Sequence, residues 1–121
     1  MAEKTAGAAG LHPVLAGAVV LVTGAGRGMG AIYARRAVEG GARAVALWDV
    51  DTDAAQRVAA TLAGPDVEVE VYGADLMDRE AIEAGARAVV ERFGQVDVLV
   101  NNAGIVRGAP FWEHDPARDI E

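Results

Sequence analysis

Residues 23–30 read TGAGRGMG, so glycine occupies every second position after the first threonine. The segment follows a short apolar run and precedes a helical pattern, which predicts a turn between a strand and a helix. Glycine backbone lets a pyrophosphate approach closely, and free N–H groups at a helix N-terminus attract its charge. A tight turn that binds no ligand is the plainer alternative. The predicted phosphate-binding residues are Gly24, Gly26, Arg27, Gly28, Met29 and Gly30.

A carboxylate stands where a dinucleotide site would need one. Asp49 ends the second predicted strand, and it follows Gly30 by about the 20 residues expected for an acid that binds the adenosine ribose. An acid there also repels a 2′-phosphate, so the sequence favours NAD over NADP as the cofactor. Arg27 could attract that extra phosphate from within the turn. A solvated turn or a helix cap is the alternative role for Asp49.

Apolar runs and helical patterns alternate along the chain in the order βαβαβαβ. The expected strands are residues 18–23, 44–48, 67–72 and 96–100, and the expected helices are residues 29–39, 51–63 and 78–93, with a further helix beginning within 111–120. Either Asp51 or Thr52 could cap the second helix. The third helix is expected to carry one apolar stripe, formed by Ile82, Ala86, Val89, Val90 and Phe93. The alternating order predicts an α/β fold, a Rossmann-like doubly wound parallel sheet that the sequence follows as far as its fourth strand. Strict alternation in VEVEVY (67–72) predicts a strand at the sheet edge. The apolar VDVLV (96–100) is instead typical of an interior strand, yet no later strand of this sequence is expected to pair with its open edge.

Two motifs later in the chain, together with the glycine-rich turn, resemble those of the short-chain dehydrogenase/reductase family. Asp75 and Leu76 follow the third strand, and Asn101-Asn102-Ala103-Gly104 reproduces the family's NNAG motif after the fourth. The resemblance covers residues 18–121 and implies a bound NAD(P). It also implies that Asp75 accepts from the adenine amino group, with Leu76 beside it. Asn101, Ala103 and Gly104 would line the nicotinamide-side ribose.

The family's catalytic YxxxK signature is missing from these 121 residues. Tyr33 is followed four positions on by Ala37, and Tyr72 by Leu76, so no catalytic residue is assigned. We therefore expect the cofactor-binding half of a longer oxidoreductase, which would transfer a hydride between NAD(H) and an alcohol or carbonyl substrate. The resemblance implies that the full-length protein is a homo-oligomer. Two alternatives are a non-catalytic dinucleotide-binding module and a transferase that binds another adenine-containing ligand.

Composition narrows the classes of partner. The chain has 121 residues, enough for one domain, and we divide it into a flexible leader (1–13) and a partial dinucleotide-binding domain (14–121). Its formal net charge of −7 argues against nucleic acid and anionic membranes as partners. It has no cysteine and two isolated histidines, so we expect no metal site and a cytoplasmic protein. No apolar run is long enough to span a bilayer.

Overall fold

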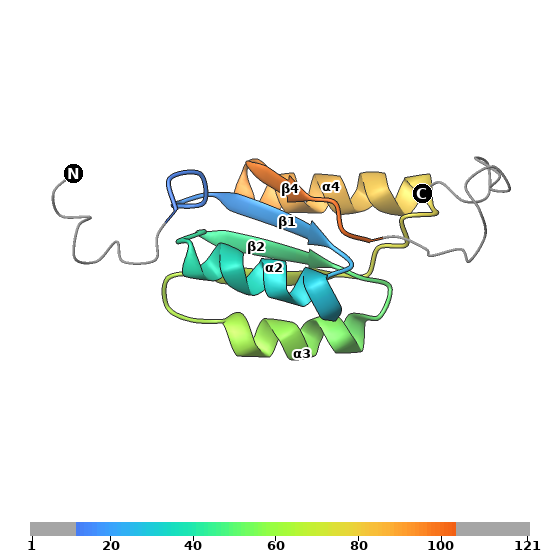
Figure 1. Ribbon diagram of the computed structural model, residues 1–121. Coiled ribbons are helices and arrows are strands. Elements are labelled where there is room, and N and C mark those ends of the chain that lie inside the picture. Colours follow the sequence, from blue (N-terminus) through green and yellow to red (C-terminus); the bar gives the residue numbers. More distant parts are fainter. Residues whose placement is uncertain (1–11, 104–121) are drawn as a thin grey trace, which may run out of the picture.

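A computed structural model describes residues 12–103, and the elements within this range follow the predicted order (Figure 1). The strands are β1 (Val19–Thr23), β2 (Ala44–Trp48), β3 (Glu68–Tyr72) and β4 (Val98–Val100). The helices are α2 (Gly28–Glu39), α3 (Thr52–Leu62) and α4 (Arg79–Phe93). The predicted fold class is confirmed. The helix expected within residues 111–120 and most of the predicted leader lie outside the described residues.

The four strands form one parallel sheet in the order β3-β2-β1-β4. The two central strands, β1 and β2, are buried at every position. Their apolar sequences VVLVT and AVALW explain this, because a parallel sheet that is covered on both faces buries its central strands completely. Their shared central position puts the segments that follow β1 and β2 side by side at the carboxyl end of the sheet.

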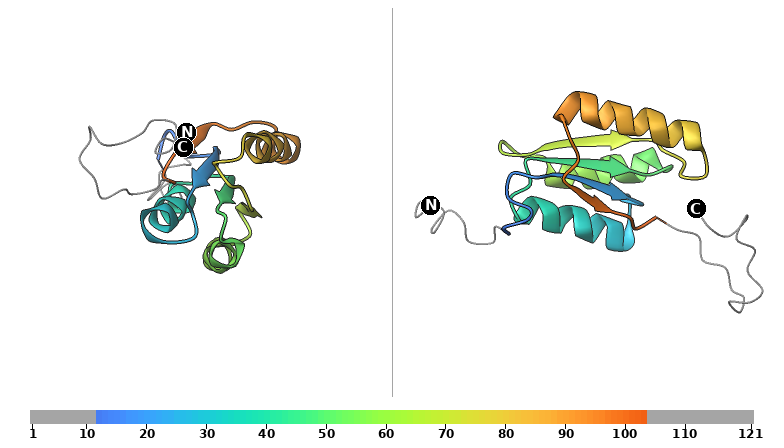
Figure 2. Two further views of the ribbon diagram at one scale, coloured as in Figure 1. Left: turned by 90° about the vertical axis from the view of Figure 1, so that its right-hand side faces the viewer. Right: turned by 90° about the horizontal axis from the view of Figure 1, so that it is seen from above.

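Helices cover both faces of the sheet, with α2 and α3 on one side and α4 on the other (Figures 1 and 2). Side chains alternate between the two faces along each strand. Val20, Val22, Val45 and Leu47 therefore pack on the α2–α3 side. Val19, Leu21 and Trp48 pack on the other side with Val89 and Phe93 of α4. The two layers together hold the carboxyl ends of β1 and β2 in place.

The two edges of the sheet differ in polarity. β3 is an edge strand as predicted, and its Glu68 and Glu70 pair with Arg92 of α4 at 3.0 and 2.9 Å. β4 has the apolar sequence of an interior strand, but within residues 12–103 it forms the opposite edge, and Leu99 is 58% exposed. The reason is that no described segment lies beyond β4.

None of the helices in residues 12–103 combines the length and the hydropathy needed to cross a membrane.

One predicted helix face is corrected by the structure. The pattern placed Ala86 and Val90 on the apolar stripe of α4, yet both are exposed. The helix instead turns Gly85 toward the sheet, where a Cβ atom would lie 2.8 Å from Cζ2 of Trp48. The large indole of Trp48 therefore needs a residue without a side chain on the helix above it. Sequence periodicity alone does not report this requirement.

Candidate functional site

The glycine-rich turn leaves β1 and enters α2 with a backbone that favours glycine. Gly24 and Gly28 have φ of +64° and +59°, in the left-handed region that other residues rarely adopt. The turn is also crowded, because a Cβ atom on Gly30 would lie 2.0 Å from the carbonyl oxygen of Gly24. The sequence therefore forms a compact loop whose backbone is open to an approaching ligand.

The N-terminus of α2 has no side-chain cap. Arg27 occupies the N-cap position, its side chain makes no capping hydrogen bond to the helix, and no acidic residue lies in the first turn. The first N–H groups of a helix have no partner within the helix and carry part of its positive dipole. An anion placed at this helix end would satisfy both features.

Asp49 ties the glycine-rich turn to the end of β2. Its Oδ2 atom accepts from the N–H of Gly26 at 2.8 Å, and its Oδ1 atom accepts from the N–H of Asp51 at 2.9 Å. These bonds fix the carboxylate at the mouth of the turn. A carboxylate has about four lone-pair sites, so two remain for the hydroxyls of a ribose.

Thr23 ties the same turn to the end of β4. It is a buried polar residue at the end of β1, and its Oγ1 accepts from the N–H groups of Asn102 and Ala103 at 2.9 and 3.0 Å. The same hydroxyl lies 3.4 Å from Oδ1 of Asn101, its acceptor. The Asn102 side chain donates to the carbonyl of Gly24 at 3.4 Å. The NNAG segment is thus held against the glycine-rich turn by neutral hydrogen bonds.

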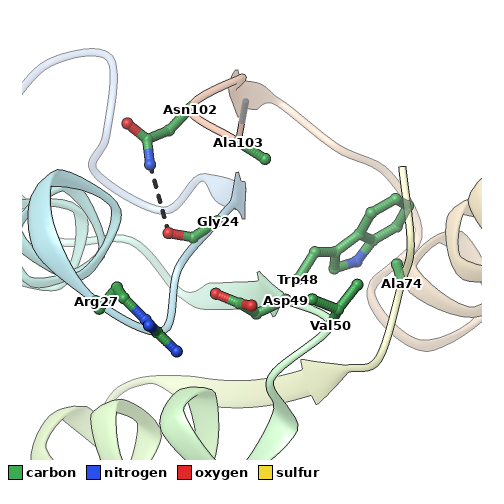
Figure 3. A pocket seen from close by; sticks show the side chains of 8 residues that line it. All are labelled: Gly24, Arg27, Trp48, Asp49, Val50, Ala74, Asn102 and Ala103. Atoms are coloured by element: carbon green, nitrogen blue, oxygen red, sulfur yellow. Dashed lines mark hydrogen bonds between the residues drawn. The ribbon is translucent and has the colours of Figure 1, made fainter. Parts of the chain in front are cut away.

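These segments enclose a pocket of about 330 Å³ at the carboxyl end of the sheet, in the size range of small-molecule sites. Figure 3 shows Arg27 and Asp49 on one side, Asn102 and Ala103 on another, and the Trp48 ring with Val50 and Ala74 on the third. The pocket therefore combines a cation, a carboxylate and an apolar wall. Such a set fits a ligand with a phosphate, a sugar and a flat ring.

The structure brings together some of the predicted site residues and separates others. Gly24, Arg27, Asp49 and Ala103 line the pocket. Gly26, Gly28, Met29 and Gly30 belong to the adjoining turn and the start of α2. Asp75 is exposed, and its Oδ1 accepts from the N–H of Met77 at 2.9 Å. Leu76 and Asn101 line a second pocket of about 290 Å³ between the sheet and α4. Gly104 lies outside the described residues.

Several pocket residues were missed by the sequence interpretation. Thr23 was included in the glycine-rich segment but was given no role, although a buried hydroxyl beside such a turn is expected to bond to the backbone. Asn102 lines the pocket and Asn101 does not, because the two side chains leave the turn in different directions. Val50 and Ala74 complete the apolar wall and carry no motif of their own.

Two ionisable side chains around the carboxyl end of the sheet have pKa values that depart from their ordinary values. Hydrogen bonding from the N–H of Ala54 lowers the pKa of the Asp51 carboxyl, with Arg27 and Arg57 adding to this effect and desolvation opposing it. Burial raises the pKa of the Tyr72 phenol, and the charge of Glu70 raises it further. A tyrosine that exchanges a proton near neutral pH needs the opposite shift. The raised pKa of Tyr72 therefore does not favour proton exchange near neutral pH.

The model of the short chain dehydrogenase family matches residues 18–121, which is most of the sequence. The chain belongs to the short-chain dehydrogenase family. The match includes both the glycine-rich turn and the NNAG segment that the structure places in contact.

Relatives within this family share the matched region. D-threitol dehydrogenase of Mycolicibacterium smegmatis is 41% identical over 82% of this chain and 38% of its own length. Estradiol 17-beta-dehydrogenase 11 of Rattus norvegicus is 37% identical over 84% of this chain and 34% of its own. The chain thus spans about a third of the length of these curated relatives.

Solved structures of the family have the same fold. A metagenomic short-chain oxidoreductase in complex with NADP superimposes with a TM-score of 0.74 at 40% identity, over 87% of this chain and 48% of that one. An oxidoreductase from Haemophilus influenza with bound NAD gives 0.70 at 26% identity, over 78% of this chain and 33% of that one. The family binds NAD(P), and these two structures hold different members of that pair.

Proposed function

We propose that this chain binds the adenosine and pyrophosphate portions of NAD(H) for a hydride-transferring oxidoreductase. The observation that carries the proposal is the meeting of an uncapped helix N-terminus with the Asp49 carboxylate at one pocket. The pyrophosphate would accept hydrogen bonds from the turn at Gly28 and Gly30, and the ribose diol would donate to Asp49. When bound, the nicotinamide ring accepts or supplies the hydride.

The preference for NAD rests on the position of Asp49. The carboxylate is held by Gly26 and Asp51 at the rim of the pocket, so it cannot swing away from a 2′-phosphate without losing both bonds. Two negative groups in that space repel each other. NADP is the less favoured cofactor for this reason.

The remaining motif residues have proposed roles around the same ligand. Asp75 uses one carboxylate oxygen for Met77, and its other oxygen would accept from the adenine amino group, with Leu76 close by. Asn101, Ala103 and Gly104 would face the nicotinamide-side ribose. Asn102 joins this set because it lines the pocket.

The full-length gene product would oxidise an alcohol or reduce a carbonyl group. Family membership supports this reaction class, and the missing YxxxK means that no residue of this sequence is assigned to proton transfer. We also propose a cytoplasmic homo-oligomer, in keeping with the absence of cysteine. A non-catalytic dinucleotide-binding module is the second candidate, because the pocket residues assigned above would serve binding alone equally well.

Replacing Asp49 tests the cofactor assignment. We expect Asp49→Ala to weaken NADH binding about tenfold or more, because charge-assisted hydrogen bonds to the ribose are lost. NADPH binding should change less, so the preference for NADH over NADPH becomes smaller. Calorimetric titration of the full-length gene product with each cofactor measures both constants. Asp66→Ala, which removes an exposed carboxylate at the opposite end of the sheet, is the matched control.

Two outcomes would count against the proposal. If Asp49→Ala leaves the affinities for NADH and NADPH unchanged, the ribose assignment is wrong. If the unmodified protein binds NADH but catalyses no hydride transfer with any alcohol or carbonyl compound, the binding module replaces the oxidoreductase.

A further inference from the structure

An ion pair beside the pocket joins the glycine-rich turn to the loop between β2 and α3. Nη2 of Arg27, in the glycine-rich turn, lies 2.5 Å from Oδ2 of Asp51, in the loop between β2 and α3. The Arg27 side chain is 72% exposed and the Asp51 side chain is 39% exposed. Arg27 also lines the pocket, whereas Asp51 does not, so the guanidinium is the partner that a ligand in the pocket would meet.

Asp51 is held in this position by backbone groups. Its Oδ1 atom caps α3 by accepting from the N–H of Ala54 at 3.0 Å, and its own N–H donates to Asp49. Its low carboxyl pKa keeps it ionised at neutral pH. Asp51 thus presents a fixed negative charge to Arg27, unlike a surface side chain that changes rotamer freely.

Arg27 is the one cationic side chain among the residues that line the pocket within the described range. Its ion pair with Asp51 cancels that charge, and Asp49 adds a further negative charge beside it. A free guanidinium at this place would attract a phosphate group by charge and by paired N–H donors. The pair therefore decides whether the rim of the pocket attracts or repels an additional phosphate.

We propose that Asp51 is a specificity-determining residue, which neutralises Arg27 and so lowers the affinity of the site for dinucleotides that carry a 2′-phosphate. This role rests on the proposed function, and it is additional to the repulsion by Asp49. Asp51 acts through Arg27 and not by touching the ribose. Asp51 is therefore a positioning residue, which acts on the ligand only by holding and neutralising the Arg27 guanidinium.

The test uses Asp51→Asn in the full-length gene product. Asparagine keeps the oxygen that caps α3, so the variant removes the charge and leaves the helix start intact. We expect NADPH affinity to rise about threefold and NADH affinity to change less than about twofold, which is the scale of exposed charge pairs. Asp53→Asn, which removes an exposed charge from the first turn of the same helix, should change neither.

A second background isolates the role of Arg27. In an Arg27→Gln protein, Asp51→Asn should give no gain in NADPH affinity beyond the Asp53→Asn control. The gain in the original background should also shrink in 0.5 M salt, since salt screens exposed charges. Asp51→Ser, which also supplies a capping oxygen, should reproduce the gain if the asparagine variant unfolds.

Specific results would overturn the inference. NADPH affinity that is unchanged, or that rises equally with Gln at position 27, shows that Asp51 does not act through Arg27. NADPH affinity that falls shows that Asp51 instead orients Arg27 for a phosphate. In both cases NADH binding by the unmodified protein leaves the proposed function standing. If that protein binds neither cofactor, the proposed function fails and the inference fails with it.

Discussion

The three helices of the described region begin in two different ways. α3 and α4 start at Asp51 and Asp78, whose carboxylates accept from backbone N–H groups of the first turn. Each also has an acidic residue in that turn. α2 starts at Arg27, whose side chain does not cap the helix, and its first turn has no acidic residue. Side chains of the protein thus cap the N-termini of α3 and α4, whereas the N-terminus of α2, at the candidate site, has no side-chain cap.

This difference between the helix N-termini shows how a stable fold can include N–H groups that have no hydrogen-bond partner within the described part of the protein. A capped helix end contributes to folding, and it has nothing left for a ligand. The open end of α2 is held instead from both sides, by Asp49 on Gly26 and by Asn102 on Gly24. The turn is therefore fixed before a ligand arrives, as binding sites require.

The largest effect is expected from filling the crowded turn. Gly30→Ala would place a Cβ atom 2.0 Å from the Gly24 carbonyl oxygen and 2.9 Å from Nδ2 of Asn102. We expect the free energy of unfolding to fall by about 1–3 kcal/mol, because the backbone of the turn must move to admit the methyl group. The displaced turn should show no measurable NADH binding. Urea denaturation and titration measure these. Gly64→Ala is the control, since that site has nothing within 4 Å, and equal behaviour of the two variants would contradict the model of the turn.

A smaller effect is expected from giving α2 the kind of first turn that α3 and α4 have. Met29 is 53% exposed in the first turn, and Met29→Glu adds an acid there. We expect thermal stability to stay equal or rise slightly, because an acid suits a helix N-terminus. NADH affinity should fall about tenfold through repulsion of the pyrophosphate. The uncharged Met29→Gln variant should bind NADH as tightly as the unmodified protein. An equal loss of NADH affinity in that variant would show that the shape of the side chain, and not its charge, weakens binding.

The smallest effect is expected at the capped helix farther from the pocket. Asp78→Ala removes bonds to the N–H groups of Glu80 and Ala81, at 3.0 and 3.4 Å. Loss of such a cap lowers the unfolding free energy by about 1 kcal/mol. NADH affinity should stay the same, and Asp78→Asn should retain most of the stability. A clear loss of NADH affinity at full stability would show that α4 takes part in binding.

Much of this arrangement could be predicted from the sequence because local rules determine it. The alternation in VEVEVY placed β3 at an edge, and Asp78 was correctly predicted to begin α4. The cap of α3 was left between Asp51 and Thr52, and Asp51 provides it. These features depend on residues a few positions apart.

The features that escaped prediction depend on contacts between distant segments. Gly85 faces the sheet because of Trp48, 37 residues earlier in the chain (85 − 48). Thr23 reaches Asn102 across 79 positions, and the ion pair of Arg27 with Asp51 spans 24. No periodicity or local motif encodes these pairs, so only the folded sheet reveals them.

The most direct test of the open helix end is an amide NMR titration of the full-length gene product with NADH. We predict the largest shifts at the N–H groups of Gly28, Met29 and Gly30, the first residues of α2. The capped N–H groups of Glu80 and Ala81 should not move. Shifts that leave the start of α2 unchanged while NADH binds would contradict the account.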